Sequence, residues 1–176
     1  MDKPMSSIGF KFMTIMFRIR DYFQPRMDLL KEAGIKSGFH VLDYGCGPGS
    51  YIAPLTELIG ANGKIYALDI HPAAIKEVER IARRKGIECI ETIVSGCHTG
   101  LPDNHADVVL LYDTFHDLSQ PDDVLRELHR VLKVGGTLSF SDHHMKAHDI
   151  IERVTNTGLF NLLKKGKKTY LFAKEG

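Results

Sequence analysis

The chain carries Val41-Leu42-Asp43-Tyr44-Gly45-Cys46-Gly47-Pro48-Gly49, an apolar run that leads directly into three closely spaced glycines. The run predicts a short buried strand over residues 40–44, and residues 50–59 have the pattern of a helix that ends at Gly60. Glycines let the backbone turn tightly and approach a ligand closely. The N-terminus of the following helix offers free N–H groups and a partial positive charge. The stretch therefore predicts a cofactor site at the carboxyl end of a strand.

Strands and helices alternate around this stretch. Helical patterns fall at 10–33, where Pro25 separates off a second helix over 26–33, and at 50–59, 73–85, 122–132 and 148–157. Strand patterns fall at 40–44, 64–70, 89–94, 107–112 and 137–141, the last after a turn at Gly135-Gly136. Residues 159–163 and 168–173 predict a hairpin closed by Lys164-Lys165-Gly166-Lys167. We therefore predict an α/β domain whose sheet is mostly parallel, with a C-terminal antiparallel hairpin.

The composition is that of one ordinary globular domain. The chain has 176 residues, 43% of them hydrophobic, and its 23 Lys and Arg nearly balance 22 Asp and Glu to give a net charge of +1. That balance argues against a broad nucleic-acid-binding surface. Three cysteines without a CxxC pair favour a reducing compartment, and no apolar run approaches the ~20 residues that cross a bilayer. We expect a cytoplasmic protein without a signal peptide or a transmembrane segment.

Two acids indicate which cofactor the Gly-rich turn serves. Asp69 ends the second predicted strand, 26 positions after Asp43, where its carboxylate can accept hydrogen bonds from ribose hydroxyls. Dinucleotides are bound by G-x-G-x-x-G, with the helix N-terminus facing a pyrophosphate. Here the spacing is Gly45-x-Gly47-x-Gly49, and Asp43 would repel a pyrophosphate. An acid at that position suits a cofactor that carries a sulfonium and an α-ammonium group, and a hydride-transferring, NAD-binding domain is the less favoured alternative.

The segment 41–49 resembles the first motif of class I S-adenosylmethionine-dependent methyltransferases. Further stretches match that family in order: Ile65–Ile70, then Gly100–Asp103 with Ala106–Val109, then Leu125–Gly136. The resemblance covers about residues 26–173 and is closest to the small-molecule branch that includes ubiquinone and menaquinone biosynthesis methyltransferases. It implies a Rossmann-like three-layer sandwich with a seven-stranded sheet, and S-adenosyl-L-methionine as cofactor.

The resemblance also implies which residues bind the methionine half of the cofactor. Asp43 would hold the α-ammonium group, the turn would line the methionine chain with its backbone, and the last residue of the fourth strand would lie beside it. These predicted cofactor-binding residues are Asp43, Gly45, Cys46, Gly47, Gly49 and Tyr112.

The adenosine half would lie along the second and third strands. Asp69 would bind the ribose hydroxyls and Ile70 would pack against adenine. The family usually has an acid before its Leu-Pro loop that accepts from the adenine amino group, but this chain has Cys97 there. Because a thiol is a weak acceptor, we expect the backbone of Cys97 and His98 to bind adenine and the affinity to be lower.

Two histidines are candidates for a general base. His116 follows the fourth strand and His143 follows the fifth, and the carboxyl ends of these strands border the ligand crevice in such sheets. A core or capping role for each is an equal alternative. His144 and His148 would share a face if their segment were helical, but they belong to no recognisable metal motif, so we predict no metal site.

The ends of the chain suggest how the acceptor is enclosed. The short stretch after the fifth strand leaves no room for a substrate-binding insertion, so residues 1–25 are predicted to form an apolar helical lid ahead of a methyltransferase domain over 26–176. A homodimer contact and a membrane contact are alternatives for that segment. The hairpin lysines 164, 165, 167 and 168 are interpreted as a solvated turn.

Together these features predict a methyltransferase that transfers a methyl group to a small acceptor by in-line displacement. The acceptor stays unidentified at this level. The main alternative is a protein that binds the cofactor but has no catalytic activity and acts as a partner or scaffold.

Overall fold

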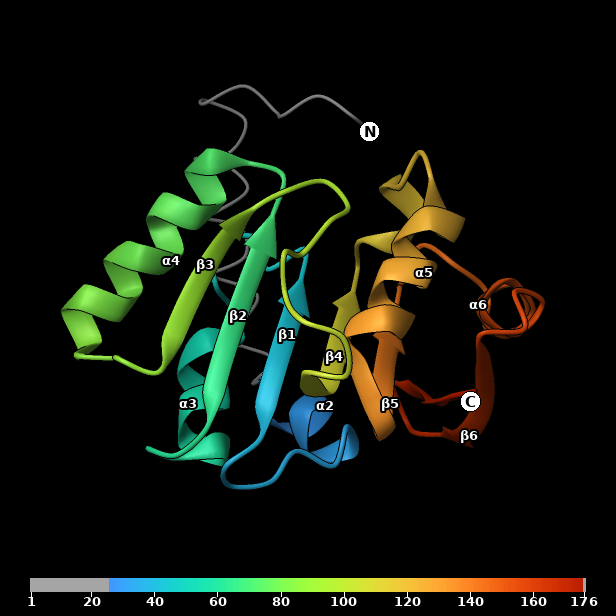
Figure 1. Ribbon diagram of the computed structural model, residues 1–176, viewed down its shortest axis with the longest axis horizontal. Helices are drawn as coiled ribbons and strands as arrows, with labels where there is room; N and C mark the ends of the chain where they lie inside the picture. Colours follow the sequence, from blue (N-terminus) through green and yellow to red (C-terminus); the bar gives the residue numbers. More distant parts are fainter. Residues whose placement is uncertain (1–25, 176) are drawn as a thin grey trace.

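The protein contains one seven-stranded sheet with the strand order β3-β2-β1-β4-β5-β7-β6 (Figure 1). The structure, a computed structural model, describes residues 26–175. The strands are β1 His40–Tyr44, β2 Lys64–Asp69, β3 Ile90–Val94, β4 Ala106–Tyr112, β5 Leu132–Ser141, β6 Phe160–Lys165 and β7 Tyr170–Lys174. Strands β1 to β5 pair in parallel with one another, whereas β7 pairs antiparallel with both β5 and β6. The predicted mostly parallel sheet with a C-terminal antiparallel hairpin is confirmed.

Helices cover both faces of this sheet, which makes three layers. One face is covered by α2 Met27–Glu32, α3 Ile52–Ile59 and α4 Pro72–Lys85, and the other by α5 Pro121–Val131 and α6 Ala147–Thr155. A single turn of 3₁₀ helix, η1 Phe115–Asp117, follows β4. The predicted Rossmann-like three-layer sandwich is therefore confirmed.

Strand β1 shows how the sequence produces these layers. Successive side chains of a strand point to opposite faces. Val41 packs in the core beneath α2, α3 and α4, whereas Leu42 and Tyr44 pack in the core beneath α5 and α6. A strand buried on both faces can be apolar throughout, which is why residues 40–44 stand out in the sequence.

Chain direction places the ligand-binding edge. Strand β1 lies between β2 and β4. The chain passes from β1 to β2 in one direction across the sheet and from β4 to β5 in the other, so these two connections diverge. In open α/β sheets, ligands bind at the carboxyl ends of the strands beside such a reversal. The Gly-rich turn after β1 and the segment after β4 therefore meet at one edge of the sheet.

Two predicted connections are wrong in detail. Strand β5 begins at Leu132, directly after α5, and not at Thr137, since Ala106 and Leu132 already pair across an irregularity in the β4–β5 register. Gly136 lies within β5, where a Cβ would come within 2.9 Å of the Asp107 carbonyl oxygen, so a close approach of two strands and not a turn requires this glycine. Helix α3 likewise begins at Ile52, two residues later than predicted.

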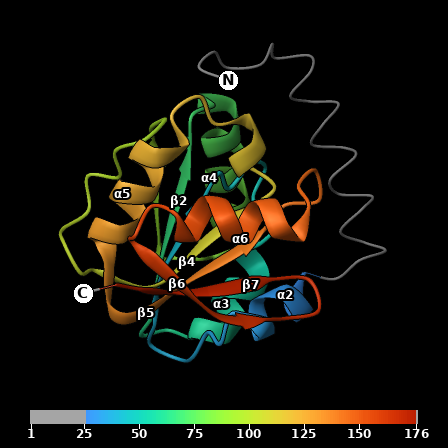
Figure 2. The same cartoon turned by 90° about the vertical axis from the view of Figure 1, so that its right-hand side faces the viewer.

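The β6–β7 hairpin turns at 166–169, two residues later than predicted, because Lys164 and Lys165 still pair with β7. Since β7 is antiparallel to β5, this turn returns to the edge where the parallel strands end. It lies beside α2 (Figure 2), and the Glu32 carboxylate accepts hydrogen bonds from the backbone N–H groups of Lys168 and Thr169, both at 3.2 Å. The Thr169 hydroxyl donates to the same carboxylate oxygen at 2.8 Å.

The predicted lid over residues 1–25 lies outside the described residues. Among residues 26–175, no helix is long and apolar enough to cross a bilayer.

Candidate functional site

The Gly-rich turn has a backbone that only glycine adopts readily. Gly45, Gly47 and Gly49 all have positive φ angles, of 78°, 52° and 84°. The N–H groups of Gly45 and Cys46 donate to the Leu68 carbonyl oxygen of β2 at 2.8 and 2.9 Å. A Cβ on Gly45 would collide with the Thr114 hydroxyl, which follows β4. The turn therefore lies in close contact with both neighbouring strands.

Asp43 is a buried acid with an unsatisfied oxygen. It lies one residue before the end of β1, its side chain is 2% exposed, and its Oδ2 has no hydrogen-bond partner among the described residues. Burial and the neighbouring Asp69 carboxylate together raise the pKa of Asp43 to about 7. Groups of this kind are found where a protein receives a charged ligand. A cation of suitable shape would supply the missing partner.

Asp69 is held at the end of β2 by three hydrogen bonds. Its Oδ2 accepts from the Gly47 N–H at 2.9 Å, and its Oδ1 accepts from the His71 N–H at 2.8 Å and pairs with Nδ1 of the His71 ring at 3.0 Å. A carboxylate has about four acceptor positions, so these bonds leave room for a ligand hydroxyl. His71 was not predicted as a partner of Asp69, although its position two residues after Asp69 could have indicated it.

The predicted adenine residues come from two segments, with Ile70 directly after β2 and Cys97 and His98 on the loop after β3. The Tyr44 hydroxyl donates to the Gly96 carbonyl oxygen at 2.8 Å and so fixes this loop to the end of β1. Ile70 packs against Gly96, because a Cβ added to Gly96 would come within 3.1 Å of the Ile70 Cδ1 atom. Cys97 is half-buried, with the pKa of its thiol raised by burial, and His98 is exposed. These residues can form one wall of a flat pocket.

Tyr112 is fixed inside the domain. Its hydroxyl forms a 2.7 Å hydrogen bond with the Ser139 hydroxyl, and its ring lies against the Tyr51 ring with centroids 5.2 Å apart. Burial raises the pKa of this phenol above its usual range. Only the ring and the backbone of Tyr112 are thus placed to contact a ligand.

The two predicted bases are each paired with an acid of the neighbouring strand. His116 Nδ1 lies 2.9 Å from Asp142 Oδ2, and its Nε2 lies 3.5 Å from Asp117 Oδ2. His143 Nδ1 lies 2.7 Å from Asp113 Oδ1, and its Nε2 has no partner among the described residues. Asp113 and Asp142 were not predicted, because these pairs exist only once β4 and β5 lie side by side.

His144 lies between the two bases. Its ring centroid is 4.2 Å from that of His116 and 3.8 Å from that of His143. Helix α6 begins at Ala147, so His144 lies outside the helix and the condition for a shared helical face with His148 is not met. In the described part of the chain, no group of three His, Cys, Asp or Glu side chains is arranged to hold a metal ion.

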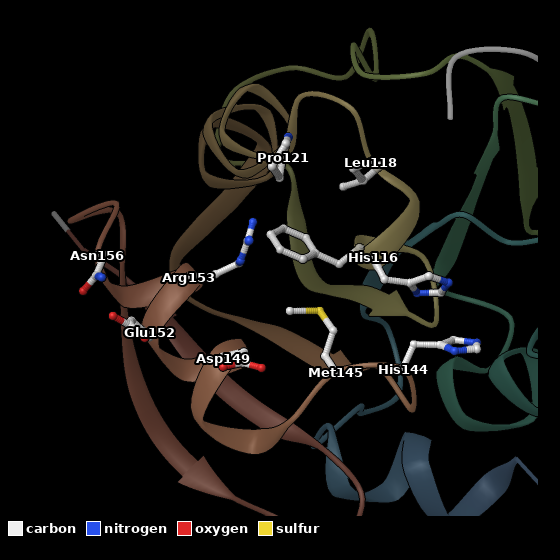
Figure 3. Close-up of a pocket in the computed structure, with 10 residues that line it drawn as sticks. His116, Leu118, Pro121, His144, Met145, Asp149, Glu152, Arg153 and Asn156 are labelled. Atoms are coloured by element: carbon white, nitrogen blue, oxygen red, sulfur yellow. The ribbon is translucent and has the colours of Figure 1, made fainter.

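A pocket of about 730 Å³ opens beside these histidines, between η1 and α6 (Figure 3). His116 and His144 lie at one end of it, and the helix α6 side chains Glu152 and Asn156 at the other. A chamber of this size suits a small organic molecule. Its lining residues are Phe115, His116, Leu118, Pro121, His144, Met145, Asp149, Glu152, Arg153 and Asn156.

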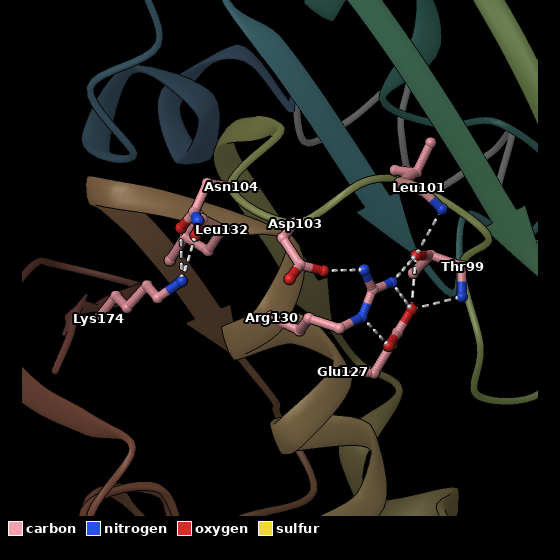
Figure 4. Close-up of polar contacts among 8 residues, drawn as sticks. All are labelled: Thr99, Leu101, Asp103, Asn104, Glu127, Arg130, Leu132 and Lys174. Carbon is pink, nitrogen blue, oxygen red and sulfur yellow. Dashed lines mark hydrogen bonds and ion pairs between the residues drawn. The ribbon is translucent and has the colours of Figure 1, made fainter. Parts of the chain in front are cut away.

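A second buried acid supports the loop after β3. Glu127 on α5 accepts from the Thr99 N–H at 2.8 Å and from the Thr99 hydroxyl at 2.6 Å, and Arg130 binds it through Nε and Nη2 at 2.8 and 2.7 Å (Figure 4). Arg130 also binds Asp103 at 2.6 Å. Burial alone would raise the pKa of Glu127, but these hydrogen bonds lower it to about 2. The acid therefore stays charged and holds residues 99–103 against α5.

Comparison with known proteins gives a family. A family model described as "Methyltransferase domain" matches residues 35–176. The chain belongs to this methyltransferase domain family. A ubiquinone/menaquinone biosynthesis C-methyltransferase, UbiE of Shewanella sediminis, is 29% identical over 77% of this chain, and the UbiE of Shewanella sp. strain W3-18-1 is 30% identical over the same share. This methyltransferase domain spans about half the length of these curated relatives, 55% in both cases.

Solved structures agree with the family. A SAM-dependent methyltransferase from Aquifex aeolicus is 27% identical, with a TM-score of 0.76 over 91% of this chain and 97% of that one. The cyclase SpnF is 23% identical, with a TM-score of 0.69 over 78% of this chain and 57% of that one. The second likeness shows the fold alone. The resemblance to class I S-adenosylmethionine-dependent methyltransferases is confirmed.

Proposed function

We propose that this methyltransferase domain binds S-adenosyl-L-methionine at the carboxyl ends of β1 and β2 and methylates a small acceptor. The observation that carries the proposal is Asp43, a buried carboxyl group two residues before Gly45, one oxygen of which has no hydrogen-bond partner among the described residues. An α-ammonium group of the cofactor would supply both the missing hydrogen bond and the missing positive charge.

The remaining residues of the turn fit the rest of that cofactor. The glycines place backbone without side chains beside a methionine chain, Asp69 retains an acceptor position for a ribose hydroxyl, and Ile70 offers an apolar surface to adenine. When bound, the cofactor supplies an electrophilic methyl group, so the protein needs only to align the acceptor and exclude water.

His143 and His116 would serve the acceptor side. His143 is the better general base, because Asp113 holds its Nδ1 and leaves Nε2 free to take a proton from an acceptor hydroxyl or amine. The Nε2 of His116 lies beside Asp117, which suits it to positioning the acceptor and the neighbouring His144 ring. An acceptor without an acidic proton would need neither residue as a base.

Partners and location follow from the same features. We infer a small-molecule acceptor, no nucleic acid and a cytoplasmic protein, in line with the net charge of +1 and three unpaired cysteines. Residues 1–25 would cover the acceptor, either within one chain or across a homodimer. Removal of residues 1–24 would then lower acceptor turnover while leaving cofactor affinity unchanged.

Calorimetric titration of the full chain tests the main proposal. We expect micromolar-range binding of S-adenosyl-L-methionine and no binding of NAD, with the first lost in Asp69→Ala and retained in Glu57→Ala, an exposed acid on α3. Absence of S-adenosyl-L-methionine binding at millimolar concentration would refute the proposal. Cofactor binding without turnover of any member of a broad acceptor panel would favour an inactive binding partner instead.

A further inference from the structure

A second pocket, of about 510 Å³, lies between α2 and the β6–β7 hairpin on the same edge of the sheet. It shares Met145 with the first pocket but has a different electrostatic character. Its lining residues are Arg26, Leu29, Asp113, Ser141, Asp142, His143, Met145, Ile150, Lys165, Gly166, Lys167, Lys168, Thr169 and Tyr170.

Three lysines of the hairpin line one side of this pocket. Lys165, Lys167 and Lys168 are exposed, and in the described part of the chain none of them forms an ion pair with an acid. Lys165 Nζ lies 5.9 Å from the centre of the Tyr170 ring, over an apolar surface of the same pocket. Their charges are therefore available to a ligand.

The two acids that line the pocket, Asp113 and Asp142, are already engaged. Asp113 accepts from the backbone and ring of His143, and Asp142 accepts from His116 and from the His144 N–H at 3.0 Å. Glu32 lies beneath the turn, where it binds backbone N–H groups and the Thr169 hydroxyl. The lining of the pocket thus combines three cationic side chains with an imidazole that is hydrogen-bonded to an acid.

We propose that this pocket binds the methyl acceptor through an anionic group, a carboxylate or a phosphate, held by Lys165, Lys167 and Lys168. The inference rests on the proposed function, since it places the other end of that acceptor at His143. Ammonium groups bind such oxyanions by charge-assisted hydrogen bonds, and the apolar side chains of Leu29, Met145 and Ile150 would cover the body of the molecule.

Topology explains why these lysines are found here. An ordinary hairpin that discourages edge pairing would need charges only along β6, the edge strand. Lys167 and Lys168 instead lie in the turn, which antiparallel pairing with β5 carries back to the carboxyl ends of β4 and β5. The sequence alone predicts a solvated turn, because it does not reveal on which edge of the sheet the turn lies.

A lipid surface is the competing ligand. Leu162 and Leu163 of β6 are 37% and 61% exposed on the same hairpin, and exposed leucines beside lysines also occur in proteins that bind anionic membranes. We favour the small anion because the lysines line the same cavity as His143, the candidate base. Binding to phosphatidylglycerol vesicles distinguishes the lipid surface from the small anion.

The experiment titrates the full chain with benzoate, phenyl phosphate and neutral benzyl alcohol, with and without S-adenosylhomocysteine, and follows amide NMR signals. We expect the anions, and not the alcohol, to move the signals of His143, Thr169 and Tyr170. In Lys165→Gln/Lys167→Gln/Lys168→Gln the affinity for the anions should fall about tenfold, the equivalent of one charge-assisted hydrogen bond. Whether the carboxylate or the phosphate binds more tightly identifies the anionic group.

A matched triple variant controls for charge. Lys36→Gln/Lys76→Gln/Lys85→Gln removes the same charge from exposed sites elsewhere and should leave the affinity unchanged. Equal loss in both variants, or shifts caused equally by benzyl alcohol, would overturn the inference. So would an effect of the hairpin variant only on binding to phosphatidylglycerol vesicles. Because anion binding is also measured without cofactor, failure here is distinguishable from failure to bind S-adenosyl-L-methionine.

Discussion

Asp43 and Glu127 are both buried carboxyl groups, yet their pKa values are shifted in opposite directions, to about 7 and to about 2. Glu127 accepts hydrogen bonds from Thr99 and forms an ion pair with Arg130, so its charge is neutralised within the fold. Asp43 has an oxygen without a partner in the part of the chain that the structure describes, and a second acid, Asp69, lies near it. The difference shows that Glu127 is satisfied within the fold, whereas Asp43 has the environment that the proposed cofactor site requires.

The largest effect should come from Asp43→Asn. Because a neutral amide cannot form an ion pair with an ammonium group, we expect the affinity for S-adenosyl-L-methionine to fall about a hundredfold or more in calorimetry. The variant should nevertheless unfold at the same temperature as the parent chain at pH 7, or higher. A fall in stability together with a small change in affinity would show that Asp43 is a structural acid like Glu127.

Glu127→Ala should produce the opposite pattern. The substitution leaves the Thr99 N–H without its acceptor and Arg130 with Asp103 as its one acidic partner among the described residues, so we expect the free energy of unfolding to fall by about 2 kcal/mol in urea titrations. The matched control is Asp123→Ala, since the Asp123–Arg126 pair on the same helix is exposed and should contribute less than about 0.5 kcal/mol. Equal effects of the two substitutions would show that Glu127 contributes no more to stability than an exposed ion pair.

The pH dependence of stability should separate the two acids. Asp43 has a raised folded pKa of about 7, so between its unfolded pKa and about 7 the folded state holds a proton that the unfolded state has lost, and stability falls as pH rises. Asp43→Asn should therefore gain on the order of 2 kcal/mol relative to the parent chain between pH 5 and pH 7. The stabilisation by Glu127 is present above its unfolded pKa and is lost only as pH falls toward about 2. Denaturation curves across this pH range would test both signs.

Cofactor affinity should follow the ionisation of Asp43. Because binding of an ammonium group requires the carboxylate, affinity should fall about tenfold per pH unit below about 7 and level off above it. Asp69→Asn, which removes the neighbouring charge, should move this midpoint to lower pH. A flat profile from pH 5 to pH 8 in the parent chain would contradict the assignment of Asp43.

The smallest expected effect concerns Cys97, where the resemblance to the family leads us to expect an acid. Cys97→Asp would add an acceptor for the adenine amino group, but Glu127 and Asp123 already act electrostatically on this position. We expect about a threefold gain in affinity for S-adenosyl-L-methionine, and no gain for Cys97→Ser. A gain in the serine variant would point to a change in packing of the loop and not to adenine recognition.

The sequence predicts best where local pattern and tertiary burial agree. Strand β1 is found at its observed bounds because residues 40–44 are buried on both faces, and the Gly-rich turn is recognisable because three glycines with positive φ are needed in five residues. Gly136 misleads because a glycine required by close strand contact has the same letter as a glycine required by a positive φ, as at Gly135.

The partners of the site residues could not be predicted in the same way. Asp113 and Asp142 bind histidines that are 30 and 26 positions away, and these pairs depend on the register of β4 against β5. The orphaned oxygen of Asp43 is likewise a property of its surroundings and not of its neighbours in sequence. The candidate residues were thus predictable, whereas their electrostatic states were not.

The contact of Glu32 with the β6–β7 turn has a consequence for local opening of the protein. The amides of Lys168 and Thr169 donate to a side chain 136 and 137 positions earlier in the chain. Their exchange with deuterated solvent should therefore require α2 and the turn to separate, even while the sheet stays intact. Two adjacent amides would then report, in a native protein, the free energy that holds this wall of the pocket closed.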